Sequence, residues 1–588
     1  MKKSVSLLLA LSVLGLTACQ SVDFPTSTDD LSEVSVVAPL FPEETEPTET
    51  EAVPDPRADF ADPNGEVCIL FTSDVHCGIN EGFGYAGLYD VRENLERQGY
   101  ATILVDDGDS VQGGVVGMLS EGDEIIELMN ALEYDVAIPG NHDFDYGADR
   151  FMELVGMADF PYVSCNINRE GLMMFDAYTI VEAADISIAF VGVTTPYTIT
   201  SSTPGIFQDE DGNYIYDFLG DENGEALVTA IQCAVDDARA DGADYVFLMA
   251  HLGEGAQCEP YTFNTIISNT TGIDAFFDGH SHDRDIVTIN NLNGEPVTRY
   301  AVGTRLEEIG YLYISPDDGI TDAGVWAWEN SVSAPDLLHI DNVINDMVNE
   351  DLAEVESVYG EVITNIGYNL LIYDPTALDE NGNPVRMIRR AETNLGDLCA
   401  DAVRSYTGAD IALLNGGGIR CNIDSGDVTL SDIMNVLPFN DNICVVEATG
   451  QQILNALEWG VRLVPDENGA FFQVSGISFD VDPSIPSGCG ADDNGFFTGV
   501  SGTRRVQNVM VAGEPIDPDA TYTVAGWDYP ILQNGDGQTA FDGCNVIAPD
   551  IAIDSEVLVD YIENTLGGEL GEDYANPYGQ GRITILEE

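Results

Sequence analysis

Five apolar, strand-like stretches in the first half of the chain each end on Asp, His or Asn. Helical patterns separate several of them, for example at 123–132 and 226–239. This alternation predicts an α/β domain with a buried, mostly parallel or mixed sheet. Strand ends are where α/β proteins place their sites, so we expect the polar residues to meet there. The five apolar stretches span 67–72, 102–106, 134–139, 245–250 and 275–277.

The histidines concentrate at these strand ends. Of six histidines, only His339 lies elsewhere, and its helix-like segment indicates a surface or packing role. A single histidine at a strand end is more often structural than a ligand. Five, most of them beside Asp, Asn or Gly, indicate a functional site. They are His76, His142, His251, His280 and His282.

Asp, His and Asn side chains offer oxygen and nitrogen ligands. Such a set suits Zn, Mn, Co or Fe better than Ca, which prefers oxygen alone. The chain has too many ligand candidates for one ion, but enough for two ions that share an Asp. Two close ions can clamp the attacking and leaving oxygens of a phosphoryl transfer. The acidic stretch 209–213 lacks the EF-hand glycine position and is predicted to be a solvated turn.

A chain of 588 residues is too long for one core, so two large domains are expected. We predict a first domain at 65–334, a connecting helix at 335–363 with amphipathic spacing, and a second domain at 364–588. The second domain carries a Gly-rich turn from Asn415 to Arg420. Its glycine spacing fits neither a dinucleotide fingerprint nor a P-loop.

The charge is strongly acidic, with 103 Asp and Glu against 20 Lys and Arg and a formal charge of -83. Phosphate backbones bind to Lys and Arg, so nucleic-acid polymers are excluded as partners. Adaptation of the whole surface to a salty medium, which screens such charge, explains the composition better than a specific acidic patch.

The N-terminus predicts export. Residues 1–18 have two lysines, an apolar run too short to span a bilayer, and the ending Leu-Thr-Ala before Cys19. The ending resembles a bacterial lipobox, which implies cleavage before Cys19 and lipid attachment to it; an ordinary secretory site is the alternative. Residues 19–64 are predicted to be a disordered acidic tether. The mature protein would be anchored at the periplasmic face of the outer membrane or at the cell surface, as a monomer or an undefined oligomer.

Ten further cysteines, an even number in an exported chain, suggest disulfides.

The strand-end residues resemble the five motifs of the calcineurin-like metallophosphoesterases. The motifs are Asp74-Val75-His76, Gly108-Asp109, Gly140-Asn141-His142-Asp143, His251 and Gly279-His280-Ser281-His282. Together with the turn at Asn415, they make the chain similar to the secreted 5'-nucleotidase family, which includes bacterial UDP-sugar hydrolases and animal ecto-5'-nucleotidase. The resemblance covers Val67 to the C-terminus. It implies an N-terminal β-sandwich flanked by helices, joined by a helix to a C-terminal substrate-binding domain.

The resemblance also implies roles for single residues. Asp74, His76 and His282 would hold one ion, Asn141, His251 and His280 the other, and Asp109 would bridge them. His142 would stabilise the transition state, oriented by Asp145, since a nearby carboxylate keeps an imidazole cationic. The family often has Glu where this chain has Asp143, and we expect no consequence.

In the second domain the resemblance implies a nucleotide site. Arg389, Asn415 and Arg420 match positions that hold the phosphate and ribose, Phe439 and Tyr529 match the two aromatics that sandwich the base, and Asp536 matches the ribose-binding acid. Two features depart from the animal enzyme. It has Phe where this chain has Tyr529, and its spacing to the acid is one residue shorter.

The expected function is that of an exported 5'-nucleotidase that uses two divalent ions, Zn, Mn or Co. UDP-sugar hydrolysis, dinucleotide pyrophosphohydrolysis and 2',3'-cyclic phosphodiesterase or 3'-nucleotidase activity are alternatives within the family. A non-enzymatic surface lipoprotein is the remote alternative. The complete ligand set favours an enzyme, and Arg389, Arg420 and the aromatic pair favour a nucleotide substrate.

Overall fold

The computed structural model describes residues 60–328, 341–378 and 384–586. The predicted signal peptide, Cys19, nearly all of the acidic tether, and His339 lie outside the described residues. Within the described part of the chain, no helix is both long and apolar enough to cross a membrane.

The first sheet is built around strand β1 (Val67–Thr72), the first of the five predicted strands. Its strand order is β14-β13-β1-β2-β3. Strand β1 pairs in parallel with β2 and antiparallel with β13. The other strands are β2 (Ala101–Asp106), β3 (Val136–Ala137), β13 (Glu308–Ser315) and β14 (Gly319–Ala327).

The second sheet has the order β11-β12-β10-β9-β7-β6. Its centre is parallel, because β9 pairs in parallel with both β7 and β10. The strands are β6 (Tyr178–Ala183), β7 (Ile186–Thr194), β9 (Tyr245–His251), β10 (Ala275–Asp278), β11 (Arg284–Asn290) and β12 (Pro296–Val302).

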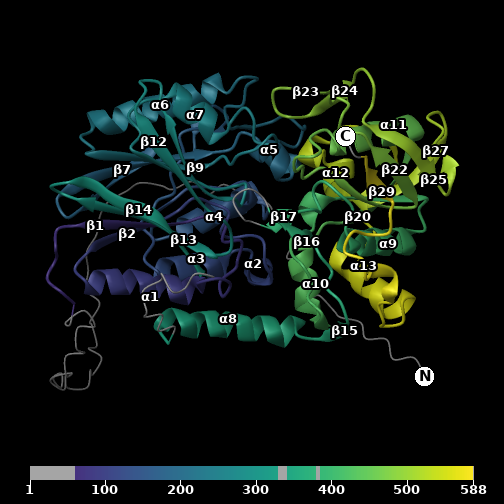
Figure 1. The fold of residues 1–588 in the computed structure, drawn as a ribbon, viewed down its shortest axis with the longest axis horizontal. Coiled ribbons are helices and arrows are strands. Elements are labelled where there is room, and N and C mark those ends of the chain that lie inside the picture. The colour runs from purple at the N-terminus through teal and green to yellow at the C-terminus, as the bar shows by residue number, and fades with distance from the viewer. Residues whose placement is uncertain (1–59, 329–340, 379–383, 587–588) are drawn as a thin grey trace, which may run out of the picture. The chain divides into compact units, whose positions relative to one another are not determined.

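The two sheets pack face to face. Alternate residues of β1 point to opposite faces, so Ile69 and Phe71 join a core shared with Phe247 and Phe277 of the second sheet. The rings of Phe71 and Phe277 stack with centroids 4.2 Å apart. Leu70 points the other way, into a core formed with helices. The predicted sandwich is therefore confirmed, and Figure 1 shows its strands and the helices around them.

Helices cover both outer faces of the sandwich. Apolar residues of α1 (Gly84–Arg97), α3 (Asp123–Ala131) and α4 (Ala148–Met157) pack on the first sheet. Those of α6 (Glu225–Ala240) and α7 (Phe263–Asn269) pack on the second. The helices predicted at 123–132 and 226–239 are thus α3 and α6.

Helix α8 (Val343–Tyr359) lies inside the range predicted for the connecting helix. Asn342 caps its N-terminus, because its side chain accepts a hydrogen bond from the Asn345 N–H. Ile344, Val348 and Val355 pack into the same core as α1 and α3.

The second domain has a five-stranded mixed sheet of order β21-β18-β27-β20-β28. Helices α9 (Asn394–Thr407) and α13 (Asp554–Asp560) cover one face, and α11 (Gly450–Gly460) packs on the other. A second sheet, β26-β25-β22-β29, shares the core beside α11. The strands are β18 (Ile411–Asn415), β20 (Ile443–Thr449), β21 (Phe472–Ser475), β22 (Ile477–Val481), β25 (Val506–Val511), β26 (Glu514–Pro515), β27 (Thr521–Trp527), β28 (Asn545–Ala548) and β29 (Ile583–Ile585).

Shorter elements complete the fold. They are α2 (Val115–Ser120), β4 (Asn168–Arg169), β5 (Leu172–Met173), α5 (Thr198–Ser201), β8 (Tyr216–Asp217), β15 (Val362–Ile366), β16 (Tyr373–Leu378), β17 (Pro384–Arg386), β19 (Gly426–Thr429), α10 (Leu430–Val436), β23 (Cys489–Ala491), β24 (Phe497–Val500) and α12 (Asp528–Leu532). The acidic stretch 209–213 is a turn, in which Asp209 accepts hydrogen bonds from the Asp211 and Asn213 N–H groups.

The disulfide prediction is wrong for this structure. The ten cysteines from Cys68 to Cys544 all carry free thiols. Their places in the fold explain this, because several are buried in separate cores: Cys165 packs against α6 and α7, Cys399 lies in α9, and Cys444 lies in β20.

Candidate active site

The strand ends bring the predicted ligands together at one edge of the sandwich. Asp74 follows β1, Asp109 follows β2, and Asn141 comes shortly after β3. From the second sheet, His251 is the last residue of β9, and His280 follows β10. Because β1, β2 and β3 run parallel, as do β7, β9 and β10, their carboxyl ends converge.

Asp74, His76 and His282 form one group of side chains that could hold a metal ion. The Nε2 atoms of His76 and His282 lie 3.1 Å apart. The Asp74 Oδ1 atom is 3.4 Å from His282 Nε2 and 3.9 Å from His76 Nε2. Three ligand atoms this close, two from imidazoles and one from a carboxylate, are a typical donor set for Zn or Mn.

Asp109, His251 and His280 form a second such group beside the first. The Asp109 Oδ2 atom lies 3.0 Å from His251 Nε2 in this group and 3.8 Å from His76 Nε2 in the first group. The carboxylate of Asp109 thus lies between the two groups, the place that a shared ligand would occupy.

Three atoms at the centre of these groups are buried without a hydrogen bond of good geometry from the described residues: Asp109 Oδ2, Asn141 Oδ1 and His251 Nε2. The first and the third form an ion pair at 3.0 Å, so of these three only Asn141 Oδ1 is left without a partner among the described residues. A buried polar atom without a partner costs about 1–3 kcal/mol. Cations between the two groups would satisfy all three atoms, so the donor set fits a pair of divalent ions.

Burial prepares three of the histidines as ligands. It lowers the pKa of His76 and of His282 well below the usual value, and it lowers the pKa of His280 to about 3. These imidazoles are therefore neutral at neutral pH, with a lone pair available for a metal. His251 differs: burial opposes its protonation, but Asp109 and Asp74 raise its pKa to about 10.

The ligand loops have an uncommon backbone conformation. Asp74, His76, Asp109, His280 and His282 all have positive φ angles, between 46° and 79°. Residues other than glycine rarely adopt this region, and such strain gathers at functional sites. The tight turns allow each strand to end abruptly and direct its side chain back toward the centre.

Asp143 holds two of these loops together, a role that the sequence did not reveal. Its carboxylate accepts hydrogen bonds from the N–H groups of Asp109, Ser110, Val111 and Gly140, at 2.7–3.3 Å. It therefore positions the backbone of Asp109 relative to the turn that carries Asn141. The signal in the sequence that could have indicated this role is the position of Asp143 directly after His142 in the Gly-Asn-His-Asp motif.

His142 and Asp145 are paired as predicted from the resemblance. His142 Nδ1 lies 2.6 Å from Asp145 Oδ2, and the His142 ring is partly exposed to the pocket. Ser202, directly after α5, donates a hydrogen bond to the Asn141 carbonyl and so supports the same turn. The Phe439 ring lies 5.4 Å from that of His142.

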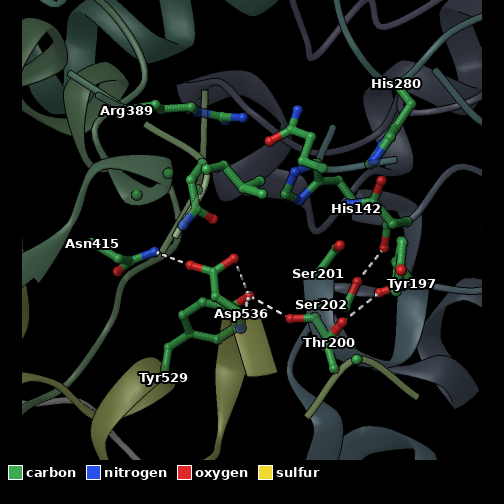
Figure 2. A pocket seen from close by; sticks show the side chains of 18 of the residues that line it. His142, Tyr197, Thr200, Ser201, Ser202, His280, Arg389, Asn415, Tyr529 and Asp536 are labelled. Atoms are coloured by element: carbon green, nitrogen blue, oxygen red, sulfur yellow. Dashed lines mark hydrogen bonds between the residues drawn. The ribbon is translucent and has the colours of Figure 1, made fainter. Parts of the chain in front are cut away.

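A single cavity of about 380 Å³ joins this centre to the second domain. Its walls include Asp109, Asn141, His142, His280 and His282. They also include all six side chains predicted to bind substrate, namely Arg389, Asn415, Arg420, Phe439, Tyr529 and Asp536. Figure 2 shows Arg389 extending across the cavity toward the side that carries His142 and His280.

Polar side chains organise the end of the cavity near Asp536. Asn415 Nδ2 donates to Asp536 Oδ2 at 2.8 Å. The Tyr529 hydroxyl accepts from the Asp536 N–H at 3.0 Å and donates to the Thr200 carbonyl at 2.8 Å (Figure 2). The hydroxyl that distinguishes Tyr529 from Phe therefore links the second domain to α5 of the first.

Four arginines surround the centre from the second domain and the adjoining loops. Arg305 pairs with Glu81 and Arg386 with Glu467, both at 2.7 Å. Arg420 Nη2 lies 3.5 Å from His76 Nε2. Burial and the neighbouring Arg386 lower the pKa of Arg389 to about 9 and that of Arg420 to about 10. Both remain charged at neutral pH and can attract an anion.

Residues 68–284 match the model of the family described as calcineurin-like phosphoesterase, and residues 374–543 match that described as 5'-nucleotidase, C-terminal domain. Protein UshA of Salmonella pullorum is 24% identical over 85% of this chain and 92% of its own length. Human 5'-nucleotidase is 26% identical over 72% of this chain and 76% of its own. The trifunctional nucleotide phosphoesterase protein YfkN of Bacillus subtilis is 26% identical over 83% of this chain, which spans 33% of that longer protein.

The fold also matches a solved structure. The 5'-nucleotidase precursor from Thermus thermophilus superposes with a TM-score of 0.72, at 24% identity, over 89% of this chain and 100% of its own. The first matched region contains both metal-ligand groups, and the second contains the six predicted substrate-binding residues. The chain therefore belongs to the calcineurin-like phosphoesterases that carry a 5'-nucleotidase C-terminal domain, and it is a metal-dependent phosphoester hydrolase.

Proposed function

We propose that this chain hydrolyses nucleoside 5'-monophosphates to nucleoside and phosphate. The observation that carries this proposal is the shared cavity: both metal-ligand groups contribute to its wall, and so do all six predicted substrate-binding side chains. Relatives named 5'-nucleotidase in human and Vibrio parahaemolyticus support the same substrate class.

The predicted metal ligands would form two sites that share one residue. Asp74, His76 and His282 would hold one divalent ion, and Asn141, His251 and His280 the other, with Asp109 shared. When bound, the ions supply the Lewis-acid charge that phosphoryl transfer requires. Zn, Mn or Co would suit these ligands.

His142 would stabilise the negative charge that develops on the phosphoryl oxygens. Its Nδ1 atom is held by Asp145, so Nε2 is directed elsewhere and can donate to the substrate. Arg389 and Arg420, two of the arginines in the cavity wall, would bind the phosphate. Asn415 and Asp536 would bind the ribose, and Phe439 and Tyr529 the base.

A substrate panel tests the proposal. Phosphate release from AMP, UDP-glucose, 2',3'-cAMP and NAD is measured with the purified protein and added Mn or Zn. The proposal predicts the highest kcat/KM for AMP. A clear preference for one of the other three substrates would assign the site to an alternative activity within the family.

Phe439 offers a test of base binding. Its side chain is only partly buried and lies on the cavity wall, outside the hydrophobic cores of the described residues. Stacking on a base contributes roughly 1–3 kcal/mol, so Phe439→Ala should lower kcat/KM for AMP about 5- to 100-fold. Hydrolysis of a small aryl phosphate, which has no base, should change little. Equal losses on both substrates, with a lower melting temperature, would indicate a packing role instead.

We also propose that the protein is exported and attached to a membrane through Cys19. The support is the sequence of residues 1–19, with its basic start, short apolar run and lipobox-like ending. Mass spectrometry of the mature N-terminus tests this, since a diacylglyceryl group on Cys19 is expected.

A further inference from the structure

Basic residues are scarce in this chain, and three of its arginines differ from the others in their surroundings. Lys2 and Lys3 are the only lysines among the 20 basic residues, against 103 acidic ones. Most described arginines contact a carboxylate or a set of carbonyl groups. Arg389, Arg420 and Arg462 line the cavity, and none of them has a carboxylate of the described residues within ion-pair distance.

The 5'-phosphate of the proposed substrate accounts for the position of two of the three, Arg389 and Arg420. Arg420 reaches His76, and Arg389 extends toward His142 and His280 (Figure 2). Arg462 is different, because the groups that it interacts with electrostatically are Asp536, Cys489 and Tyr197. It belongs to the Asp536 end of the cavity, where no charge of a nucleoside 5'-monophosphate is expected.

Arg462 is anchored firmly at that end. Its guanidinium carbon lies 3.6 Å from the centroid of the Trp459 ring, and Nη1 donates to the Trp459 carbonyl at 3.0 Å. Trp459 in turn donates from Nε1 to the Asp536 carbonyl at 2.9 Å. Stacking on a ring leaves the N–H edge of a guanidinium available to bind a phosphate. Burial lowers the pKa of Arg462 to about 10, so the group stays charged at neutral pH.

We propose that Arg462 forms a second anion subsite, which binds a phosphate on the 2' or 3' oxygen of the ribose. This deepens the proposed function and rests on it: the chain would accept nucleoside bisphosphates and remove their 5'-phosphate. The ribose is the expected neighbour, because Asp536 is the predicted ribose-binding acid and shares Trp459 with Arg462. The cavity wall also includes Ser487 and Cys489, and Cys489 is among the groups that interact electrostatically with Arg462.

The Asp536 carboxylate opposes a second phosphate, and two features limit that repulsion. Oδ2 is occupied by the Asn415 amide, at 2.8 Å. The positive charges of Arg389 and Arg462 also act on the Asp536 carboxylate and offset part of its negative charge. In the reaction, water adds to the 5'-phosphorus, the P–O5' bond breaks, and O5' takes a proton. The products are inorganic phosphate and a nucleoside 2'- or 3'-phosphate.

Steady-state kinetics with AMP and adenosine 3',5'-bisphosphate test the proposal. The wild type should cleave the bisphosphate with a kcat/KM at least equal to that for AMP. Arg462→Gln should lower kcat/KM for the bisphosphate about 10- to 100-fold, the effect of losing a hydrogen bond between charged groups, and that for AMP less than 3-fold. Arg462→Lys should keep most of the bisphosphate activity. Arg404→Gln, on the exposed surface of α9, is the matched control and should change neither substrate.

The outcomes separate this inference from the proposed function. If the wild type cleaves AMP but not the bisphosphate, or if Arg462→Gln lowers both substrates equally, the second subsite is wrong and the nucleotidase function stands. If the wild type cleaves neither substrate, the proposed function fails. In that case the subsite is tested by ligand binding, measured as the rise in melting temperature of the chelator-treated protein. The bisphosphate should raise the melting temperature more than AMP does, and Arg462→Gln should abolish this difference. Equal shifts in wild type and variant would overturn it.

Discussion

His142 and the metal ligands lie next to each other, and their roles can be separated by mutation. His142→Asn should keep both metal ions, because His142 contributes to neither ligand group. It should lower kcat about 10²- to 10³-fold, the usual effect of removing one preorganised transition-state donor. Metal analysis alongside AMP kinetics checks both statements. Loss of an ion in this variant would mean that His142 is a ligand.

Asp397 provides a prediction on pH. Burial is the main cause that raises its pKa to about 8, with Glu392 adding to the effect and Arg582 opposing it. The folded state thus binds a proton that the unfolded state, with an ordinary Asp, releases near pH 4. Folding stability should therefore fall as pH rises from about 4 to 8.

Asp397→Asn removes this titration while its amide can still donate to Glu392. The free energy of unfolding of the variant should fall less between pH 5 and pH 8 than that of the wild type. The difference should be at least about 1.4 kcal/mol, the equivalent of one pKa unit. Urea unfolding at the two pH values measures it, and parallel pH profiles would show that Asp397 is ionised in the folded protein.

The strand ends depend on glycines that leave space for the ligands. A Cβ atom on Gly279 would lie 2.1 Å from Ser73 Oγ, 2.8 Å from Asp74 Oδ2 and 3.0 Å from His251 Nδ1. Gly279→Ala should therefore displace ligands of both groups and lower metal content and activity together. Gly156→Ala, in helix α4 with no atom within 4 Å of the new Cβ, is the control and should leave both unchanged. Full metal content in the Gly279 variant would show that the site adapts.

The strands that carry the site were predictable, because each is a short apolar run with a polar end. Strands β1 and β9 begin where the sequence placed them, and the histidines at their ends converge as expected. The positive φ angles of Asp74 and Asp109 were not predictable, since they depend on contacts between distant loops such as the hydrogen bond from the Asp74 N–H to the Gly108 carbonyl. Arg462 and Trp459 were missed for the same reason: Trp459 lies in the last turn of α11 and Arg462 in the turn after it, and this spacing has no local signature.

The charge of the whole molecule has a consequence for stability. With a formal charge of -83, the unfolding temperature should rise with salt, because ions screen the repulsion between like charges. The Debye length falls from about 10 Å at 0.1 M to about 3 Å at 1 M. Calorimetry across this range measures the effect. A flat unfolding temperature would indicate that bound cations already neutralise the surface.

Metal titration of the chelator-treated protein tests most directly whether two bound ions support nucleotide hydrolysis. The ions would be held by the seven predicted ligands, Asp74, His76, Asp109, Asn141, His251, His280 and His282. Phosphate release from AMP is measured as Mn or Zn is added in steps. Activity should be absent without metal and should reach its plateau at two ions per chain, and Asp109→Ala should weaken binding of both. Turnover without metal, a plateau at one ion, or a fully loaded protein that releases no phosphate from AMP would contradict this.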